Sequence, residues 1–288
     1  MLFKNTNLSK QKIAHNMKKI LDNAKKTIIG AVHFPPLLGY HGFPGFEIAL
    51  KNAKQDVRAF EQGKADAIIF ENNYDVPHKT NVDPGTIASM AYLCAQLKRE
   101  TKLPIGISVL WNDYQSAFAI ANIVKAQFIR VPVFVDKIKT KHGIITGNPK
   151  DVLFARKKLK ADDVLIFADI HVKHAQLLSK RSLISSAKEA QKQRADAIII
   201  TGSYTAQAPA LDDLASVAST VRIPVLAGSG VDSKNISTIL KYCKGVIVST
   251  SLKKGLAWRS ERNVKSYEQR IGANKVKQLI QSAKNKLF

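Results

Sequence analysis

The chain has 288 residues, of which 45% are hydrophobic, and 45 Lys and Arg against 22 Asp and Glu give it a formal net charge of +23. This length suits one large α/β domain, and no apolar run approaches the roughly 18 residues that a membrane-spanning helix requires. Two cysteines, Cys94 and Cys243, exclude a disulfide framework, and the basic N-terminus lacks the apolar core of a secretory signal, so we expect a cytoplasmic protein.

Eight short apolar runs rich in Val and Ile follow one another along the chain, as buried parallel strands do. They lie at residues 27–34, 67–72, 105–111, 128–135, 164–172, 197–202, 224–230 and 246–251. Segments with helical periodicity separate them, at residues 46–62, 84–101, 113–125, 149–159, 182–194, 211–221 and 233–242. Strict alternation with a count of eight predicts a single closed (β/α)₈ barrel rather than an open sheet.

We predict one domain, with a barrel over residues 27–255 and an extra basic helix at each end, in residues 1–26 and 256–288. Residues 1–26 carry a net charge of +6, and residues 252–288 carry +8. Such ends attract nucleic acid or anionic membranes. The chain has no RGG repeats, zinc-finger spacings or interleaved aromatic residues, so we interpret the ends as solvated lysine-rich helices and do not expect nucleic acid as a partner.

Two small-residue turns follow the last two predicted strands. Gly228-Ser229-Gly230 ends the seventh strand, and Thr250-Ser251 ends the eighth. In (β/α)₈ barrels these two loops frequently bind phosphate, because glycine lets the backbone approach an anion and exposed N–H groups donate to it. Each turn alone is also an ordinary tight loop, but their joint position predicts a phosphate site.

The fifth predicted strand carries three ionisable residues, Asp169, His171 and Lys173. Because side chains alternate along a strand, this spacing predicts that all three point to one side. Ionisable groups that face a barrel interior are costly to bury without partners or a polar pocket. We therefore assign them to catalysis, with Asp169 as a base or orienting carboxylate, His171 as a general acid/base and Lys173 as an electrostatic or Schiff-base group.

Polar residues also end the other strands. Glu71 is a fourth catalytic candidate, because two carboxylates across a pocket separate each other's pKa values. The predicted substrate-binding residues are His33, Asn72, Asn112, Arg130, Thr201, Gly202 and Ser203. For Asn72 the alternative is a loop-fixing role, and for Arg130 it is an ion pair with Glu71 or Asp169.

No cofactor is predicted. A divalent metal held by His33, Glu71, Asp169 and His171 is conceivable, since imidazole and carboxylate are common ligands. The chain has no His-x-His or His-Glu-x-x-His spacing, so the metal site is the weaker hypothesis. The longest loops on the catalytic face are predicted at residues 35–45, 73–83, 136–148 and 173–181.

Several of these blocks together resemble the BtpA family, which includes SgcQ-like proteins. The resemblance spans residues 27–255 and rests on Gly30-Ala31-Val32-His33, residues 66–72, residues 104–113, residues 168–174, residues 224–230 and residues 245–253. Residues 34–36 and Trp111 depart from the family pattern. The resemblance implies a barrel of the ribulose-phosphate-binding type.

The leading hypothesis for function is an enzyme that acts on a small phosphorylated sugar or nucleoside-like metabolite. The resemblance implies a nucleosidase-type hydrolase, and the same residues also suit lyase or isomerase chemistry around a carbonyl. The alternative is a non-catalytic assembly or regulatory factor, because the family name comes from photosystem I biogenesis. We also expect a homo-oligomer that associates through outer helices.

Overall fold

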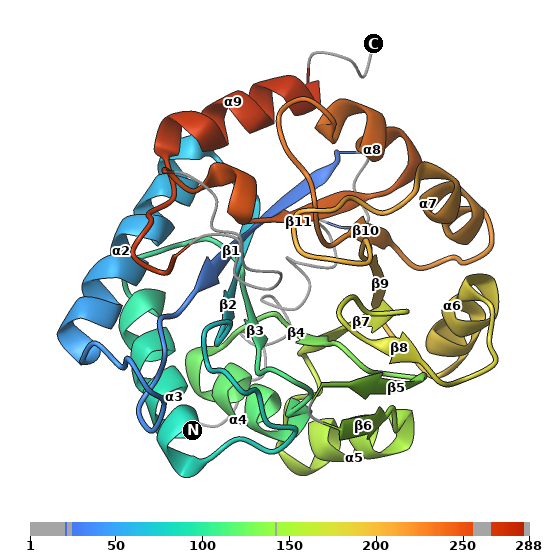
Figure 1. Cartoon of the computed structure of the whole chain (residues 1–288), viewed down its shortest axis with the longest axis horizontal. Helices are drawn as coiled ribbons and strands as arrows, with labels where there is room; N and C mark the ends of the chain where they lie inside the picture. Colours follow the sequence, from blue (N-terminus) through green and yellow to red (C-terminus); the bar gives the residue numbers. More distant parts are fainter. Residues whose placement is uncertain (1–20, 22–24, 142, 256–265, 285–288) are drawn as a thin grey trace, which may run out of the picture.

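The computed structural model describes residues 21, 25–141, 143–255 and 266–284. Eight parallel strands close into a barrel in the order β1-β11-β10-β9-β7-β4-β3-β2, inside a ring of helices (Figure 1). The strands are β1 (Thr27–His33), β2 (Ala67–Glu71), β3 (Ile105–Ser108), β4 (Phe128–Val131), β7 (Leu165–Ile170), β9 (Ala197–Ile200), β10 (Val225–Ala227) and β11 (Gly245–Val248). This confirms the predicted fold class, although most strands end earlier than their apolar runs.

The helices begin where the sequence supplies suitable first residues. Asp113, Asn148 and Ser182 each accept a hydrogen bond from a backbone N–H in the first turn of the helix that follows them. The helices are α2 (Phe46–Gly63), α3 (Pro84–Lys98), α4 (Tyr114–Val124), α5 (Pro149–Lys158), α6 (Leu183–Lys192), α7 (Leu211–Ala218), α8 (Ile236–Tyr242), the short 3₁₀ helix η1 (Thr250–Leu252) and α9 (Ala273–Lys284). In the described part of the chain, no helix is long and apolar enough to cross a membrane.

The two predicted terminal helices differ in outcome. Most of the predicted helix in residues 1–26 lies outside the described residues; Leu21, Lys25 and Lys26 are described, and Leu21 is buried. At the other end, α9 lies within the predicted segment 256–288 and packs against α2 and α8. The packing against α2 is close, because a Cβ at Gly63 would lie 2.2 Å from the Val276 side chain. α9 is therefore part of the helical ring.

A small antiparallel sheet replaces two of the predicted loops. It consists of β5 (Lys137–Thr140), β6 (Gly143–Thr146) and β8 (Gln176–Leu177), with β5 in the middle. Ile138 and Ile145 point from it into a small apolar cluster with Trp111, Val133 and Val172. The long loops predicted at residues 136–148 and 173–181 therefore contain short strands, because this cluster gives the hairpin an apolar face of its own.

The alternation of side chains inside the barrel places the polar residues at one end. The inner core consists mainly of Ile29, Ala31, Ala67, Ile69, Phe128, Phe167, Ala197, Ile199, Leu226 and Ile247. The rings of Phe128 and Phe167 stack with their centroids 4.3 Å apart, and a Cβ at Gly106 would lie 2.2 Å from the Phe128 ring. Two residues further along β1, β2, β4 and β7, the same inward direction is taken by His33, Glu71, Arg130 and Asp169.

Candidate active site

A cavity of about 320 Å³ opens at the carboxyl ends of the barrel strands. His33, Glu71 and Arg130 line it from β1, β2 and β4, and Lys173 lines it from the loop after β7. Residues 228–232, after β10, and residues 248–251 and Lys253, at and after the end of β11, complete its wall. The carboxyl end of the strands is where (β/α)₈ barrels carry their active sites.

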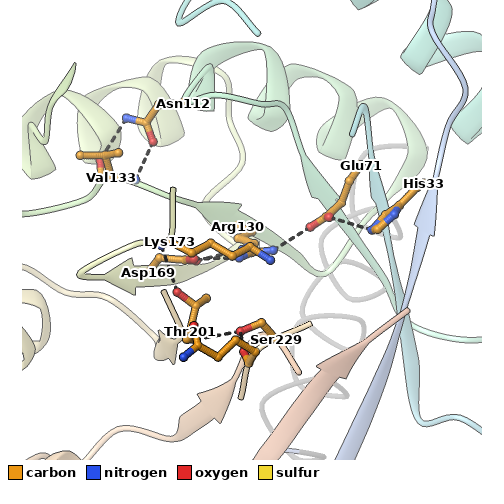
Figure 2. Close-up of polar contacts among 11 residues, drawn as sticks. His33, Glu71, Asn112, Arg130, Val133, Asp169, Lys173, Thr201 and Ser229 are labelled. Carbon is orange, nitrogen blue, oxygen red and sulfur yellow. Dashed lines mark hydrogen bonds and ion pairs between the residues drawn. The ribbon is translucent and has the colours of Figure 1, made fainter. Parts of the chain in front are cut away.

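The inner end of the cavity is a continuous chain of buried charges (Figure 2). Arg130 donates from Nε to Asp169 Oδ1 at 2.9 Å and from Nη2 to Asp169 Oδ2 at 2.7 Å. Its Nη1 donates to Glu71 Oε1 at 3.0 Å. The other carboxylate oxygen of Glu71 lies 3.4 Å from Nε2 of His33. Arg130 therefore pairs with both carboxylates, as one of the two interpretations of this residue predicted.

These contacts decide the charges near neutral pH. Burial alone would raise the pKa of Glu71, but the charge of Arg130 and hydrogen bonds from His33 and Arg130 lower it to about 2. Burial lowers the pKa of His33, which leaves its imidazole neutral. Burial raises the pKa of Asp169, and the paired hydrogen bonds from Arg130 oppose that rise. Glu71 is therefore a fixed anion and not a proton carrier.

Lys173 is a candidate catalytic residue whose pKa is shifted towards neutrality. Burial and the nearby charge of Arg130 lower the pKa of Lys173 to about 8, although Glu71 and Asp169 oppose the shift. Its backbone N–H donates to Thr201 Oγ1 at 3.1 Å, which fixes the loop. Within the described residues, the Nζ atom of Lys173 has no hydrogen-bond or ion-pair partner. This amine is free to meet a ligand in the cavity.

His171 does not join the other strand-five residues. β7 ends at Ile170, and His171 has a φ of 47°, so the alternation of the strand stops before it. Its Nε2 lies 3.3 Å from Ser186 Oγ on α6, and its backbone N–H donates to Asp136. The prediction that His171 is an acid/base in the central pocket is therefore wrong, because the left-handed turn points its imidazole outward.

Two predicted substrate-binding asparagines hold loops instead. Asn72 accepts from the backbone N–H of Leu110 at 2.7 Å and donates to Asp75 at 3.1 Å. Asn112 accepts from the backbone N–H of Val133 at 2.9 Å and donates to its carbonyl at 3.0 Å, apart from the charged chain (Figure 2). Neither asparagine lines the cavity, so the loop-fixing alternative holds for Asn72 and the binding role of Asn112 is corrected.

The residues after β9 serve a neighbouring hollow. Thr201, Gly202 and Ser203 line it together with His171 and Lys173, and they do not line the central cavity. The backbone N–H of Gly202 donates to Ser229 Oγ at 2.8 Å. These three residues therefore support the loops that carry Lys173 and Ser229, and their prediction as direct ligands of the central pocket is corrected.

All five predicted phosphate-binding residues line the cavity: Gly228, Ser229, Gly230, Thr250 and Ser251. Two of their hydroxyls donate hydrogen bonds to backbone carbonyls: Ser229 donates to Gln207 O and Ser251 donates to Val231 O, both at 2.7 Å. Gly230 has a φ of 64°, and a Cβ there would lie 2.0 Å from the backbone of Ala208. Backbone N–H groups and Thr250 are left to meet an anion.

The cavity is also lined by residues that were not predicted as site residues, among them Tyr74, Trp111, Ser249 and Lys253. Lys253 is 3% exposed, and its Nζ donates to Tyr74 Oη at 2.8 Å and to the carbonyl of Ser266 at 3.3 Å. Trp111 Nε1 and Ser249 Oγ are buried with no hydrogen-bond partner in the described part of the chain. The sequence could have placed Lys253 at the cavity, because this residue follows Thr250 and Ser251 in the same loop.

The metal hypothesis fails on the geometry. Arg130 lies between Glu71 and Asp169, and His171 points away from both. Among the residues that the structure describes, no three His, Cys, Asp or Glu side chains are grouped closely enough to hold a metal ion. Glu71 and Asp169 bind the guanidinium of Arg130 instead, and His33 contacts Glu71.

The closed barrel and its pocket define the class of protein: a (β/α)₈ barrel with a cavity at the carboxyl ends of its strands. A thiamine phosphate pyrophosphorylase from Pyrococcus furiosus has the same fold, with a TM-score of 0.58 and 16% identity over 94% of this chain and all of that one. The (S)-3-O-geranylgeranylglyceryl phosphate synthase from Thermoplasma acidophilum, solved with its substrate sn-glycerol-1-phosphate, gives a TM-score of 0.55 and 14% identity over 94% of this chain and 98% of that one.

The chain belongs to the BtpA family, whose model matches residues 24–285. An uncharacterized protein from Archaeoglobus fulgidus is 40% identical over 83% of this chain and 96% of its own length. The photosystem I biogenesis protein BtpA from Synechocystis is 38% identical over 79% of this chain and 80% of its own length. The resemblance to the BtpA family that the sequence blocks indicated is thereby confirmed.

Proposed function

We propose that this protein is an enzyme that acts on a small phosphorylated sugar or nucleoside-like metabolite in the cavity. The observation that carries the proposal is the buried chain His33–Glu71–Arg130–Asp169, which lies beside the unpaired amine of Lys173. Buried ion pairs contribute little net stability, since desolvation offsets their attraction. A pocket that retains them is therefore organised for a polar ligand.

The cavity divides naturally into two parts. The loops after β10 and β11 offer backbone N–H groups, and Lys253 adds a positive charge nearby, so this part suits a phosphate group. Lys173, His33 and Glu71 line the part that faces the rest of the ligand. The names of two similar solved barrels contain phosphorylated compounds, and one of the two was solved with a phosphorylated substrate, which supports a phosphorylated ligand for this cavity.

Isomerase or lyase chemistry suits these residues better than hydrolysis of a nucleoside. Hydrolysis needs a carboxylate that takes a proton from water, and Glu71, with a pKa of about 2, is a weak base. Lys173, with a pKa of about 8, can give or take a proton near neutral pH. Chemistry around a carbonyl needs such a group beside a fixed anion, and Glu71 supplies the anion.

The experiment is thermal unfolding against a panel of phosphorylated sugars, nucleosides and nucleotides. A ligand at about 100 times its Kd adds about 2.7 kcal/mol of stability, which raises the melting temperature clearly. Thr250→Glu places a carboxylate at the proposed phosphate site, and Thr250→Gln is the matched neutral control. We expect the shift to vanish in Thr250→Glu and to persist in Thr250→Gln. A panel without any stabilising phosphorylated compound contradicts the proposal.

A second candidate is a non-catalytic assembly factor, favoured by the name of the Synechocystis relative, a photosystem I biogenesis protein. An assembly factor uses an outer surface, so its function tolerates changes inside the cavity. If replacement of Lys173 and Glu71 leaves the biological role intact while the protein stays folded, this candidate replaces the enzyme. If that role is lost together with ligand binding, the enzyme is retained.

A further inference from the structure

We propose that Lys173 forms a covalent imine with its substrate, so that the substrates of this enzyme are phosphorylated aldehydes or ketones. This inference rests on the proposed function and narrows it to one substrate class and one residue. It adds a bond-forming step that a phosphate-binding pocket alone does not require.

The geometry separates Lys173 from the other lysine of the cavity. Lys253 is held through its Nζ by the hydroxyl of Tyr74, with the ammonium also 5.0 Å from the ring centre, and by the carbonyl of Ser266. Lys173 lines the same cavity, and its Nζ has no hydrogen-bond or ion-pair partner among the described residues. Lys173 is partly exposed into the cavity, so its amine is accessible to a ligand there.

The surroundings keep Lys173 reactive. Burial and the positive charge of Arg130 lower the pKa of Lys173 to about 8. Roughly a tenth of the lysine is then neutral at pH 7, whereas an ordinary exposed lysine is almost entirely protonated. A neutral amine is the form that attacks a carbonyl carbon.

The step balances without an oxidant or reductant. The lone pair of neutral Nζ attacks the carbonyl carbon, and the π electrons of C=O move to oxygen. A proton passes from nitrogen to that oxygen to give a carbinolamine. The oxygen takes a second proton from water, the C–O bond breaks, one water molecule leaves, and a protonated imine remains.

Two nearby carboxyl groups favour this cation. Glu71 and Asp169 both lie close enough to raise the pKa of Lys173 electrostatically, so they stabilise a positive charge on its nitrogen. A protonated imine withdraws electrons from the bond beside it, which allows an adjacent C–H or C–C bond to break. The imine therefore leads to the isomerase or lyase chemistry already proposed.

The experiment is borohydride trapping of the whole protein with two aldehyde probes of different length, glyceraldehyde 3-phosphate and ribose 5-phosphate. Borohydride reduces an imine to a stable amine, and peptide mass mapping then locates the modified lysine. Lys173→Met removes the proposed nucleophile. Lys51→Met is the matched control, because Lys51 lies on the exposed side of α2, away from the cavity. Thermal shifts with the same probes, and with glycerol 3-phosphate, which has no carbonyl, report binding separately.

We expect one main adduct on Lys173, which forms faster as the pH rises towards 8. Glycerol 3-phosphate is expected to decrease the yield of this adduct, because it competes for the same cavity. Lys51→Met keeps that adduct, and Lys173→Met loses it while glycerol 3-phosphate still raises its melting temperature. Thermal shifts without an adduct on Lys173 overturn the imine and leave the phosphate pocket standing. The absence of both shifts and adducts contradicts the proposed function as well.

Discussion

Arg130 organises the site at the scale of single residues. Its planar guanidinium reaches two carboxylates from different strands, with three hydrogen bonds of 2.7 to 3.0 Å. A lysine cannot form this fork, because an ammonium is a point charge. The geometry holds Glu71 ionised beside Arg130, in the cavity that Lys173 also lines.

Removal of Arg130 is expected to destabilise the protein strongly. Arg130→Met leaves Glu71 and Asp169 buried without their partner, which costs about 3–5 kcal/mol of unfolding free energy. The exposed pair of Arg58 with Glu100 is the control, and Arg58→Met is expected to cost less than about 1 kcal/mol. Urea unfolding at pH 7 measures both. Equal losses in the two variants contradict the role of Arg130.

Lys173 is expected to lower stability below about pH 8. Its pKa is about 8 when folded and about 10.5 when unfolded, so the unfolded chain binds more protons between these values and stability rises with pH there. Lys173→Met removes this cost and is expected to gain about 1–3 kcal/mol at pH 7. Unfolding free energies from pH 7 to pH 11 provide the test. If the stability gained by Lys173→Met does not decrease above pH 8, the low pKa of the Lys173 amine is not the cause of the gain.

The sequence predicted the direction of a site residue only where that residue lies within a strand, because the prediction depends on the alternation of side chains along a strand. Glu71, Arg130 and Asp169 lie within strands, so their inward direction follows from a period of two. His171 lies one residue beyond a strand end, in a left-handed turn that the pattern does not encode. Lys173 lines the cavity from the loop after that turn, so its place there does not follow from strand alternation.

At the scale of elements, the sheet of β5, β6 and β8 supports the catalytic face. β8 follows the loop that carries Lys173 and pairs with β5. Asp136, just before β5, accepts hydrogen bonds from the hydroxyl of Ser186 and the backbone of His171. The sheet therefore ties the loop after β7 to the barrel. Its strands are too short, and the Lys-rich β5 too polar, to stand out from sequence.

Loosening this sheet is expected to free the loop that carries Lys173. Ile138 on β5 is 1% exposed within the apolar cluster, and Ile138→Ala is expected to cost about 2–4 kcal/mol. Ile144 on the neighbouring β6 is 57% exposed, so Ile144→Ala is a matched control with an effect within about 0.5 kcal/mol. Amide hydrogen exchange is expected to accelerate in residues 171–178 of Ile138→Ala alone. Unchanged exchange there refutes the supporting role.

At the scale of the whole molecule, the barrel brings residues from distant parts of the chain to one pocket. Closure between β1 and β11 places His33 around the same cavity as the loops that follow β10 and β11. The strand count and the order of apolar runs predicted this closure, because each buried strand is a separate apolar run. Trp111 Nε1 and Ser249 Oγ, which have no hydrogen-bond partner among the described residues, owe their burial to packing, and no sequence pattern predicts it.

The most direct measurement is a crystal structure of the protein grown with ribose 5-phosphate. We expect the phosphate against residues 228–230 and the first turn of η1, with the carbonyl end of the sugar directed at Nζ of Lys173. A sugar phosphate bound in the reverse direction contradicts the role of Lys173. A cavity without ligand at a saturating concentration contradicts the central claim that this pocket binds phosphorylated metabolites.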